Sequence, residues 1–91
     1  MALTTGQFQD YDFNRMVVRF TMKNDEVSVA CAISTDAMDA LEGSSRTPPE
    51  KREQQFLRLL DRIETRAAQK FSAVELEGNP PGVILRAIDF R

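Results

Sequence analysis

The stretch that decides the fold is residues 16–34, MVVRFTMKNDEVSVACAIS. Apolar side chains alternate with polar or small ones on both sides of a polar centre. Side chains along a strand point to opposite faces in turn, so a period of two predicts a strand with one buried face. The centre, Lys23 to Glu26, contains an Asn-Asp pair typical of tight turns. We therefore predict a β-hairpin whose strands each carry one apolar face, made of Met16, Val18, Phe20 and Met22 on the first and Val27, Val29, Cys31 and Ile33 on the second.

A short helix is predicted directly after this hairpin. Ser34 or Thr35 can act as its N-cap, because a side-chain oxygen there accepts a hydrogen bond from a free backbone N–H. Asp36 and Asp39 lie in its first turn, where carboxylates interact favourably with the helix dipole. Gly43 is the expected left-handed stop.

A long helix is predicted after a surface loop, from Pro48 to at least Lys70. Thr47 is its expected N-cap, Pro48 its first helical residue, and Glu50 completes a T-x-x-E capping box. The helix is expected to end near Phe71. Its apolar stripe at helical spacing consists of Phe56, Leu59, Leu60, Ile63, Ala67 and Phe71.

The remaining segment predicts a turn followed by a strand. The sequence Asn79-Pro80-Pro81-Gly82 indicates a turn. Val83 to Phe90 is rich in branched residues and reads as the closing strand. It is apolar on both faces, which favours a central strand or one covered on its second side, by the N-terminal aromatic residues or by another subunit. Residues 73–77 fit either a frayed last turn of the long helix or a short strand, and both alternatives stay open.

These elements predict a single α+β domain over residues 1–91 with the order β-β-α-α-β. A three-stranded, or four-stranded, antiparallel sheet packs against one short and one long helix. Residues 1–12 form an irregular N-terminal arm tethered by Phe8 and Tyr11. Ninety-one residues support one small core and no large internal cavity.

Charge and cysteine content narrow the function classes. Twelve basic against fourteen acidic residues give a net charge of −2, which argues against a general nucleic-acid or anionic-membrane binder. The longest apolar run, residues 29–33, is far shorter than the ~20 residues that span a bilayer, and the N-terminus lacks the pattern of a signal peptide. A single cysteine fits a reducing compartment. We expect a cytoplasmic protein with no membrane association.

Catalytic, metal and cofactor chemistry find little support. The chain has no histidine, so the usual general base and the Ser-His and Cys-His pairings are absent. Cys31 shares its strand face with apolar residues, which predicts a buried, unreactive thiol. The acidic pairs Asp10/Asp12 and Asp36/Asp39 do not match a calcium-binding loop. We therefore predict no catalytic residue, no metal site and no cofactor, and we expect the protein not to be an enzyme.

One side of the long helix carries more aligned positive charge than an ordinary helix surface. We name it the basic flank, and it consists of Lys51, Arg58, Arg62, Arg66 and Lys70. Acidic residues lie mainly on the other side of the apolar stripe. Cations four residues apart on a helix repel each other by a few tenths of a kcal/mol per pair.

Three interpretations of the basic flank are open. It can be a solvated surface whose arginine stems cover the edge of the core. It can pair with acids elsewhere, such as Asp36, Asp39 and Glu42, in this subunit or a neighbour. It can also bind an anionic ligand or nucleic acid, although the acidic balance of the chain counts against that.

The chain also resembles a known family. The residues that carry the likeness are Val18-x-Phe20, residues 29–34 (VACAIS), Arg62-Ile63-Glu64-x-x-Ala67 and Ile88-Asp89-Phe90. In this order they are similar to a small bacterial family catalogued as the domain of unknown function number fourteen eighty-eight. The resemblance implies a free-standing α+β domain of strand–strand–helix–helix–strand type. It brings no catalytic or ligand residues, since none is established for that family.

The sequence favours a non-catalytic cytoplasmic interaction module. Its charged helix and the small outer face of its second hairpin strand would meet a protein partner or a second copy of the chain. The alternative is an accessory nucleic-acid-associated regulator that uses Arg58, Arg62, Arg66 and Lys70.

Overall fold

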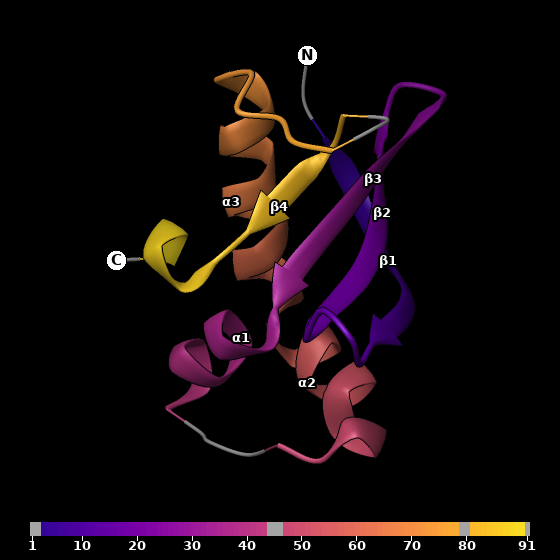
Figure 1. Cartoon of the computed structure of the whole chain (residues 1–91). Coiled ribbons are helices and arrows are strands. Elements are labelled where there is room, and N and C mark those ends of the chain that lie inside the picture. The colour runs from indigo at the N-terminus through magenta and orange to yellow at the C-terminus, as the bar shows by residue number, and fades with distance from the viewer. Residues whose placement is uncertain (1–2, 44–46, 79–80, 91) are drawn as a thin grey trace.

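The chain folds into one four-stranded sheet with helices on one face, in a computed structural model that describes residues 3–43, 47–78 and 81–90. The strands lie side by side in chain order (Figure 1). Neighbours among the first three are antiparallel, and the last strand runs parallel to the third. The strands are β1 (Thr4–Asp12), β2 (Val17–Asn24), β3 (Val27–Ser34) and β4 (Val83–Leu85).

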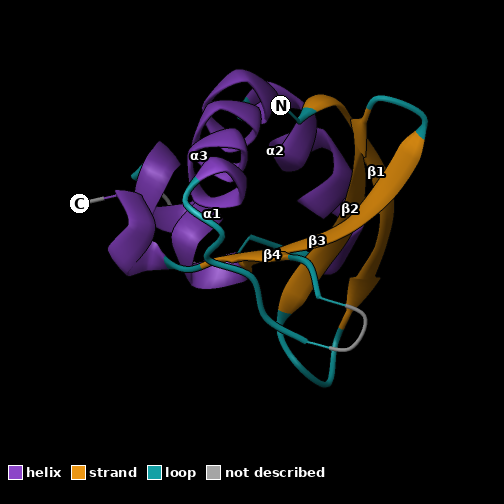
Figure 2. Cartoon of the chain, turned by 90° about the horizontal axis from the view of Figure 1, so that it is seen from above, coloured by secondary structure: helices purple, strands orange, loops and turns teal. Residues whose placement is uncertain are grey.

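All helices pack on the same face of the sheet, as the view from above shows (Figure 2). The core lies between the two layers and is filled by Phe20, Met22 and Ile33 from the sheet and by Phe56 and Ile63 from the helices, all fully buried. The helices are α1 (Thr35–Glu42), α2 (Arg52–Arg58) and α3 (Leu60–Ser72), with the short 3-10 turns η1 (Pro49–Lys51) and η2 (Ala87–Phe90).

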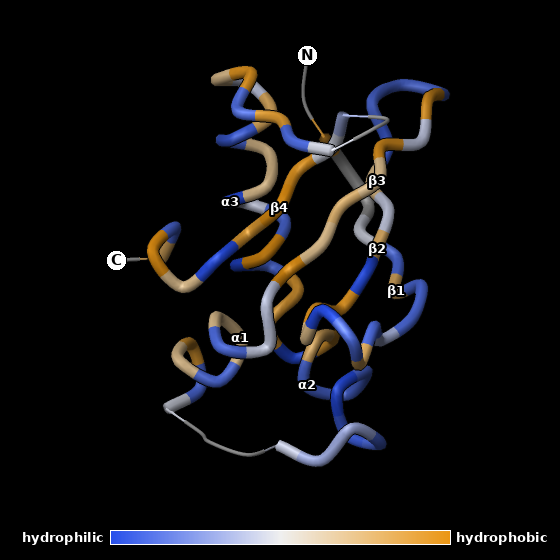
Figure 3. The backbone as a smooth tube through the Cα atoms, viewed as in Figure 1, coloured by the Kyte–Doolittle hydropathy of each residue, from blue (hydrophilic) through white to orange (hydrophobic). Residues whose placement is uncertain are grey.

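The predicted α+β class and the central hairpin are confirmed. β2 and β3 pair residue by residue from Val17↔Ser34 to Asn24↔Val27, without interruption. Much of β3 and of the neighbouring β4 is apolar (Figure 3). The alternation fails only at the ends of the hairpin, where Met16 and Val27 are exposed by 52% and 64%.

The prediction of a wholly antiparallel sheet is wrong at its last strand. β4 pairs parallel with β3, from Cys31↔Val83 to Ile33↔Leu85. All helical segments except η2 lie between these two strands in the sequence, and a long crossover of this kind returns the chain in the same direction.

The irregular N-terminal arm is a second correction, because residues 4–12 form β1 and pair with β2. The register shifts between Thr4 and Gln7 and again between Phe8 and Asp10. Such irregularities insert unpaired residues and break the period of two on which a strand prediction depends.

The long helix begins later than predicted, and its capping box does not form. Pro48 is extended, with ψ 148°, and η1 begins at Pro49 without a side-chain cap. The reason is steric, since a residue that precedes a proline is disfavoured in the helical region. Thr47 instead donates its hydroxyl hydrogen to Asp39 Oδ1 at 2.9 Å.

The same helix is also divided at Leu59, where φ −97° and ψ 4° leave the regular helical range. Hydrogen bonds continue through this residue, from its N–H to the Gln55 oxygen at 3.1 Å and from the Ile63 N–H to its own oxygen at 3.0 Å. α2 and α3 therefore meet at a bend. The predicted helix end near Phe71 is confirmed by the end of α3 at Ser72.

The closing segment is shorter than predicted and lies at an edge of the sheet. Only Val83–Leu85 is a strand, and η2 follows it. Residues 73–77 are neither helix nor strand beyond a single bridge between Glu77 and Gly82. A Cβ on Gly82 would lie 2.0 Å from the Ala30 carbonyl oxygen, so only glycine lets the chain enter β4 this close to β3.

The α1 caps agree with the sequence prediction. Ser34 accepts a hydrogen bond from the Ala37 N–H at 3.1 Å, and Gly43 ends the helix with φ 69°. Parts of two predicted turns, residues 44–46 and 79–80, lie outside the described residues. No helix of the described ranges is long and apolar enough to cross a bilayer.

Candidate interaction surface

Two cations of the basic flank are engaged by the C-terminal turn η2. Lys70 is 5% exposed and donates to the Ile84 oxygen at 2.8 Å and to Asp89 Oδ2 at 3.2 Å. Arg66 donates from Nε to the backbone oxygen of Asp89 at 2.6 Å. Lys70 thus donates a hydrogen bond to a backbone carbonyl of β4. β4 is an edge strand, and its free backbone polar groups could otherwise pair with another chain.

The surroundings of the Asp89 carboxylate favour its charged form. Burial acts to raise its pKa, but the Arg86 N–H at 2.7 Å, Lys70 and Arg66 outweigh that effect and hold the pKa below its ordinary value. Asp89 is therefore ionised at neutral pH and fixes η2 to α3.

Arg58, one turn before Arg62, is paired with α1. It donates from Nε to Glu42 Oε2 at 2.9 Å and from Nη2 to Oε1 at 3.2 Å. Hydrogen bonding between these two side chains is the main cause of the lowered pKa of Glu42 and of the raised pKa of Arg58. The Arg58 side chain is 57% exposed, so the pair adds little to stability.

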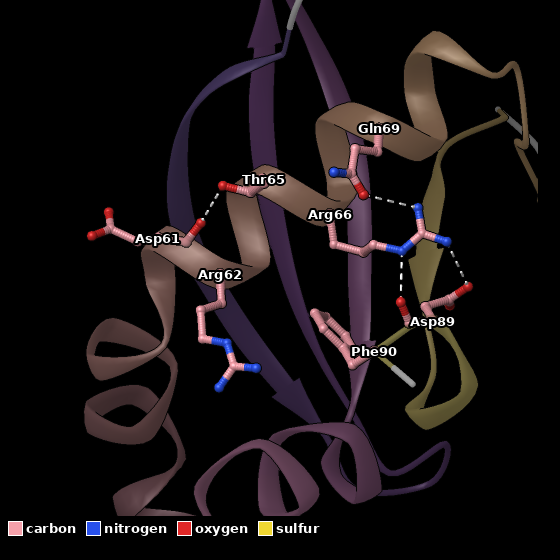
Figure 4. Close-up of a pocket in the computed structure, with 7 residues that line it drawn as sticks. All are labelled: Asp61, Arg62, Thr65, Arg66, Gln69, Asp89 and Phe90. Carbon is pink, nitrogen blue, oxygen red and sulfur yellow. Dashed lines mark hydrogen bonds and ion pairs between the residues drawn. The ribbon is translucent and has the colours of Figure 1, made fainter.

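Arg62 and Lys51 differ from the other three cations. Both are exposed, and neither side chain has a hydrogen bond or ion pair with any residue in the described ranges. The Arg62 side chain points away from Asp61 and lies on the same side of α3 as Phe90 (Figure 4). Of the three interpretations of the flank, pairing within the chain therefore applies to Arg58, Arg66 and Lys70.

Arg62 borders two hollows between α3 and its neighbours. The larger, about 530 Å³, is lined by polar α3 residues and by η2, and the smaller, about 290 Å³, lies toward α1. Arg62 and Phe90 line both, so the two hollows adjoin at these side chains, and we name the pair the α3–η2 groove. Its remaining lining residues are Asp61, Thr65, Arg66, Gln69 and Asp89 in the larger part, and Ala40, Leu41 and Ala87 in the smaller.

A buried polar cluster that the sequence analysis missed joins α1 to α2. Asp39 accepts hydrogen bonds from Arg52 Nη1 at 2.8 Å, Gln55 Nε2 at 3.0 Å and Thr47 at 2.9 Å. Arg52 is 4% and Gln55 0% exposed. The T-x-x-E pattern had assigned Thr47 to a cap, and no local pattern marks Arg52 or Gln55 as buried. This cluster positions α1 beside the groove.

The other candidate chemistries have structural explanations. Cys31 is buried as predicted, and burial raises the pKa of its thiol to about 11. Asp10 pairs with Arg19 across β1 and β2, and Asp12 accepts from the Asn14 N–H at 3.0 Å in the turn. Within the described ranges, no three His, Cys, Asp or Glu side chains are grouped closely enough to hold a metal ion.

The predicted cover of the closing strand by N-terminal aromatics is wrong. β1 lies at the opposite edge of the sheet from β4, and Phe8 packs on the helix side against Phe56 with ring centroids 5.9 Å apart. Glu77, which is bridged to Gly82 just before β4, pairs with Arg86, the residue after β4, at 2.7 Å.

Comparison with known proteins establishes the family. The family described as "Protein of unknown function (DUF1488)" matches residues 5–81. The chain belongs to the DUF1488 family. A solved DUF1488 structure, a protein of unknown function from Shewanella loihica PV-4, has 16% sequence identity, a TM-score of 0.78 and 93% coverage of each chain. This likeness shows that the two proteins share the fold. No curated protein matches the sequence.

Proposed function

We propose that this DUF1488 protein is a non-catalytic protein-interaction module whose contact surface is the part of the basic flank around Arg62. One observation carries the proposal. Arg58, Arg66 and Lys70 are bonded to Glu42 and Asp89, whereas Arg62 has no partner among the described residues and lies in a groove. An isolated arginine beside apolar side chains is typical of the central residues of protein interfaces.

The pairing of the flank counts against the nucleic-acid alternative. Binding to a phosphate backbone requires several free cations, each of which displaces condensed counterions. Three of the five cations are ion-paired within the chain, with the two carboxylates of Glu42 and Asp89, and the net charge of the chain is −2. Of the flank, only Arg62 and Lys51 are left unpaired among the described residues, and Arg62 lies beside an apolar wall.

The state of the single cysteine supports a non-catalytic, cytoplasmic role. With no histidine in the chain, Cys31 would be the natural nucleophile, but its buried thiol has a pKa of about 11 and is protonated at neutral pH. A free thiol is also what a reducing compartment maintains.

The test is a tagged chain cross-linked in its native cells and purified with nuclease treatment, as wild type, Arg62→Glu and Lys51→Glu. Lys51 is a matched control, because it is also exposed, on the same flank and without a described partner. We expect a stoichiometric protein partner with wild type and Lys51→Glu that is lost with Arg62→Glu. Equal capture by all three chains would contradict the proposed surface.

Fluorescence anisotropy with labelled DNA and RNA oligonucleotides tests the alternative on the same three chains. Non-specific affinity no tighter than roughly 0.1 mM at physiological salt is expected. Micromolar, salt-dependent binding that Arg62→Glu removes would replace the proposal with a nucleic-acid function.

A further inference from the structure

The smaller part of the α3–η2 groove combines one charge with an apolar wall. Among the residues that the structure describes, Arg62 is its only charged lining residue, and the others are Ala40, Leu41, Ala87 and Phe90. A guanidinium offers a planar fork of donors that fits a carboxylate at two points. Apolar walls beside it favour a ligand that carries an aliphatic or aromatic group next to its carboxylate.

The size of this space limits what can enter. Its volume of about 290 Å³ lies just below the range, roughly 300–1,000 Å³, that small-molecule sites occupy. The space therefore suits one or two amino-acid side chains better than a nucleotide-sized cofactor.

The larger part of the groove suits a peptide backbone. Gln69 accepts from Arg66 through Oε1 at 3.4 Å, and its Nε2 has no partner among the residues described, so it can donate to a carbonyl. Thr65 donates to the Asp61 oxygen at 2.8 Å and keeps a free acceptor oxygen. The Asp61 carboxylate in the same lining repels anions in the larger part, so the negative group of a ligand is expected in the smaller part, where the described lining residues include no acid.

We propose that the α3–η2 groove binds an acidic segment of a partner protein, in which an Asp or Glu stands beside a large apolar residue. The carboxylate pairs with Arg62, the apolar side chain enters the space between Leu41 and Phe90, and the backbone runs past Gln69. This inference rests on the proposed function and names the chemistry of its partner. The bound segment is internal rather than terminal, because Arg62 lines both hollows and each can take part of the chain.

The experiment is a selection from a displayed random-peptide library in which both peptide ends are joined to the carrier protein. The bait is the full chain, with counter-selection against Arg62→Ala. We expect enrichment of peptides with a carboxylate next to a large apolar residue. A synthetic peptide of the selected sequence, with blocked ends, should then bind Arg62→Ala about tenfold or more weaker than it binds wild type, because the variant lacks the hydrogen-bonded charge.

Two further variants separate the parts of the site. Arg62→Lys keeps the charge and loses the two-point fork, so weakening of several-fold is expected. Ala40→Glu brings a carboxylate and extra volume to an exposed α1 position that lines the smaller space, and it should abolish binding while the circular dichroism spectrum stays unchanged. Lys51→Ala is the matched control and should bind as wild type does.

The inference is overturned if the selected peptides lack the acidic–apolar pair, or if Arg62→Ala and Ala40→Glu bind them as tightly as wild type. It is also overturned if the groove serves a second copy of the chain, which gel filtration would show as a dimer lost in Ala40→Glu. A cross-linked partner that depends on Arg62 without any preference for acidic–apolar peptides would leave the proposed function standing and refute this inference alone.

Discussion

We predict that the buried cluster around Asp39 holds α1 in its position beside the groove. The Asp39 carboxylate accepts from three side chains, and the Arg52 guanidinium that it neutralises is 4% exposed. Asp39→Ala leaves this charge buried with only Gln55 Oε1, at 2.6 Å from Nη1, as a strong acceptor. Breaking a buried ion pair in this way costs about 3–5 kcal/mol, a large part of the roughly 5–15 kcal/mol that holds a small domain folded.

A double-mutant cycle shows whether the stranded charge is the cause. Arg52→Met removes the cation and keeps much of the side-chain volume, so Asp39→Ala/Arg52→Met should be more stable than Asp39→Ala alone. We expect a coupling energy of about 2 kcal/mol, from urea denaturation followed by far-ultraviolet circular dichroism. Asp36→Ala is the control on the same helix, since this exposed carboxylate contributes at most a dipole effect of about 0.3–1 kcal/mol. Additive effects of the two mutations would refute the argument.

The pH dependence of Asp39→Ala provides a second readout. Burial acts to raise the pKa of Asp39, but hydrogen bonds from Arg52, Gln55 and Thr47 outweigh it and the pKa is lowered. A carboxyl with a lower pKa in the folded state stabilises the protein above its unfolded pKa of about 4, and that stability is lost as the pH falls through the folded value. The difference between wild type and Asp39→Ala should therefore be constant from about pH 5 to 7 and shrink below about pH 4.

Three further predictions concern single positions. Thr47→Ala should lower the free energy of unfolding by about 0.5–1.5 kcal/mol, because it removes the hydrogen bond to Asp39, whereas Glu50→Ala should leave the urea midpoint unchanged, since no capping box forms. Gly82→Ala should lower the free energy of unfolding by more than about 1–3 kcal/mol, the usual effect of overpacking, because its Cβ meets the Ala30 oxygen in the backbone of β3. An unchanged urea midpoint would contradict the close approach of the two segments. Cys31 should react with a thiol reagent far more slowly in the native protein than in urea, and equal rates would show that the thiol is accessible.

The hairpin was predictable because its pairing is regular. The β2–β3 register runs without a bulge, so each apolar residue keeps its face and the period of two survives in the sequence. β1 has comparable length but two register irregularities, and it puts Phe8 and Tyr11, three positions apart, opposite Phe20 and Val18. No strict alternation is left for a sequence pattern to detect.

The start of the long helix shows how one local rule overrides another. The T-x-x-E pattern at Thr47 and Glu50 favours a capping box, but it spans two consecutive prolines. Pro49 restricts Pro48 to an extended conformation and moves the first helical turn one residue along the chain. Thr47 is then free to bond Asp39, a contact that only the folded position of α1 creates.

The candidate surface could be predicted as a row of cations but not as a site. A helical projection places Arg58, Arg62 and Arg66 on one flank, and it contains no information about the elements that pack across from them. The acids that neutralise this row come from the end of α1 and from η2, 16 and 23 residues away in the chain.

The absence of an acid beside Arg62, among the described residues, follows from where these two elements end. α1 places Glu42 beside Arg58, and η2 places Asp89 beside Arg66, about one helical turn to either side of Arg62. Between the two acids, the same elements present only Ala40, Leu41, Ala87 and Phe90 to the space beside Arg62. An acidic residue at any of these positions would neutralise Arg62 as its neighbours are neutralised. Arg62 is thus left without an acid among the described residues and lies against an apolar wall, and that combination is what a carboxylate with an apolar neighbour would recognise.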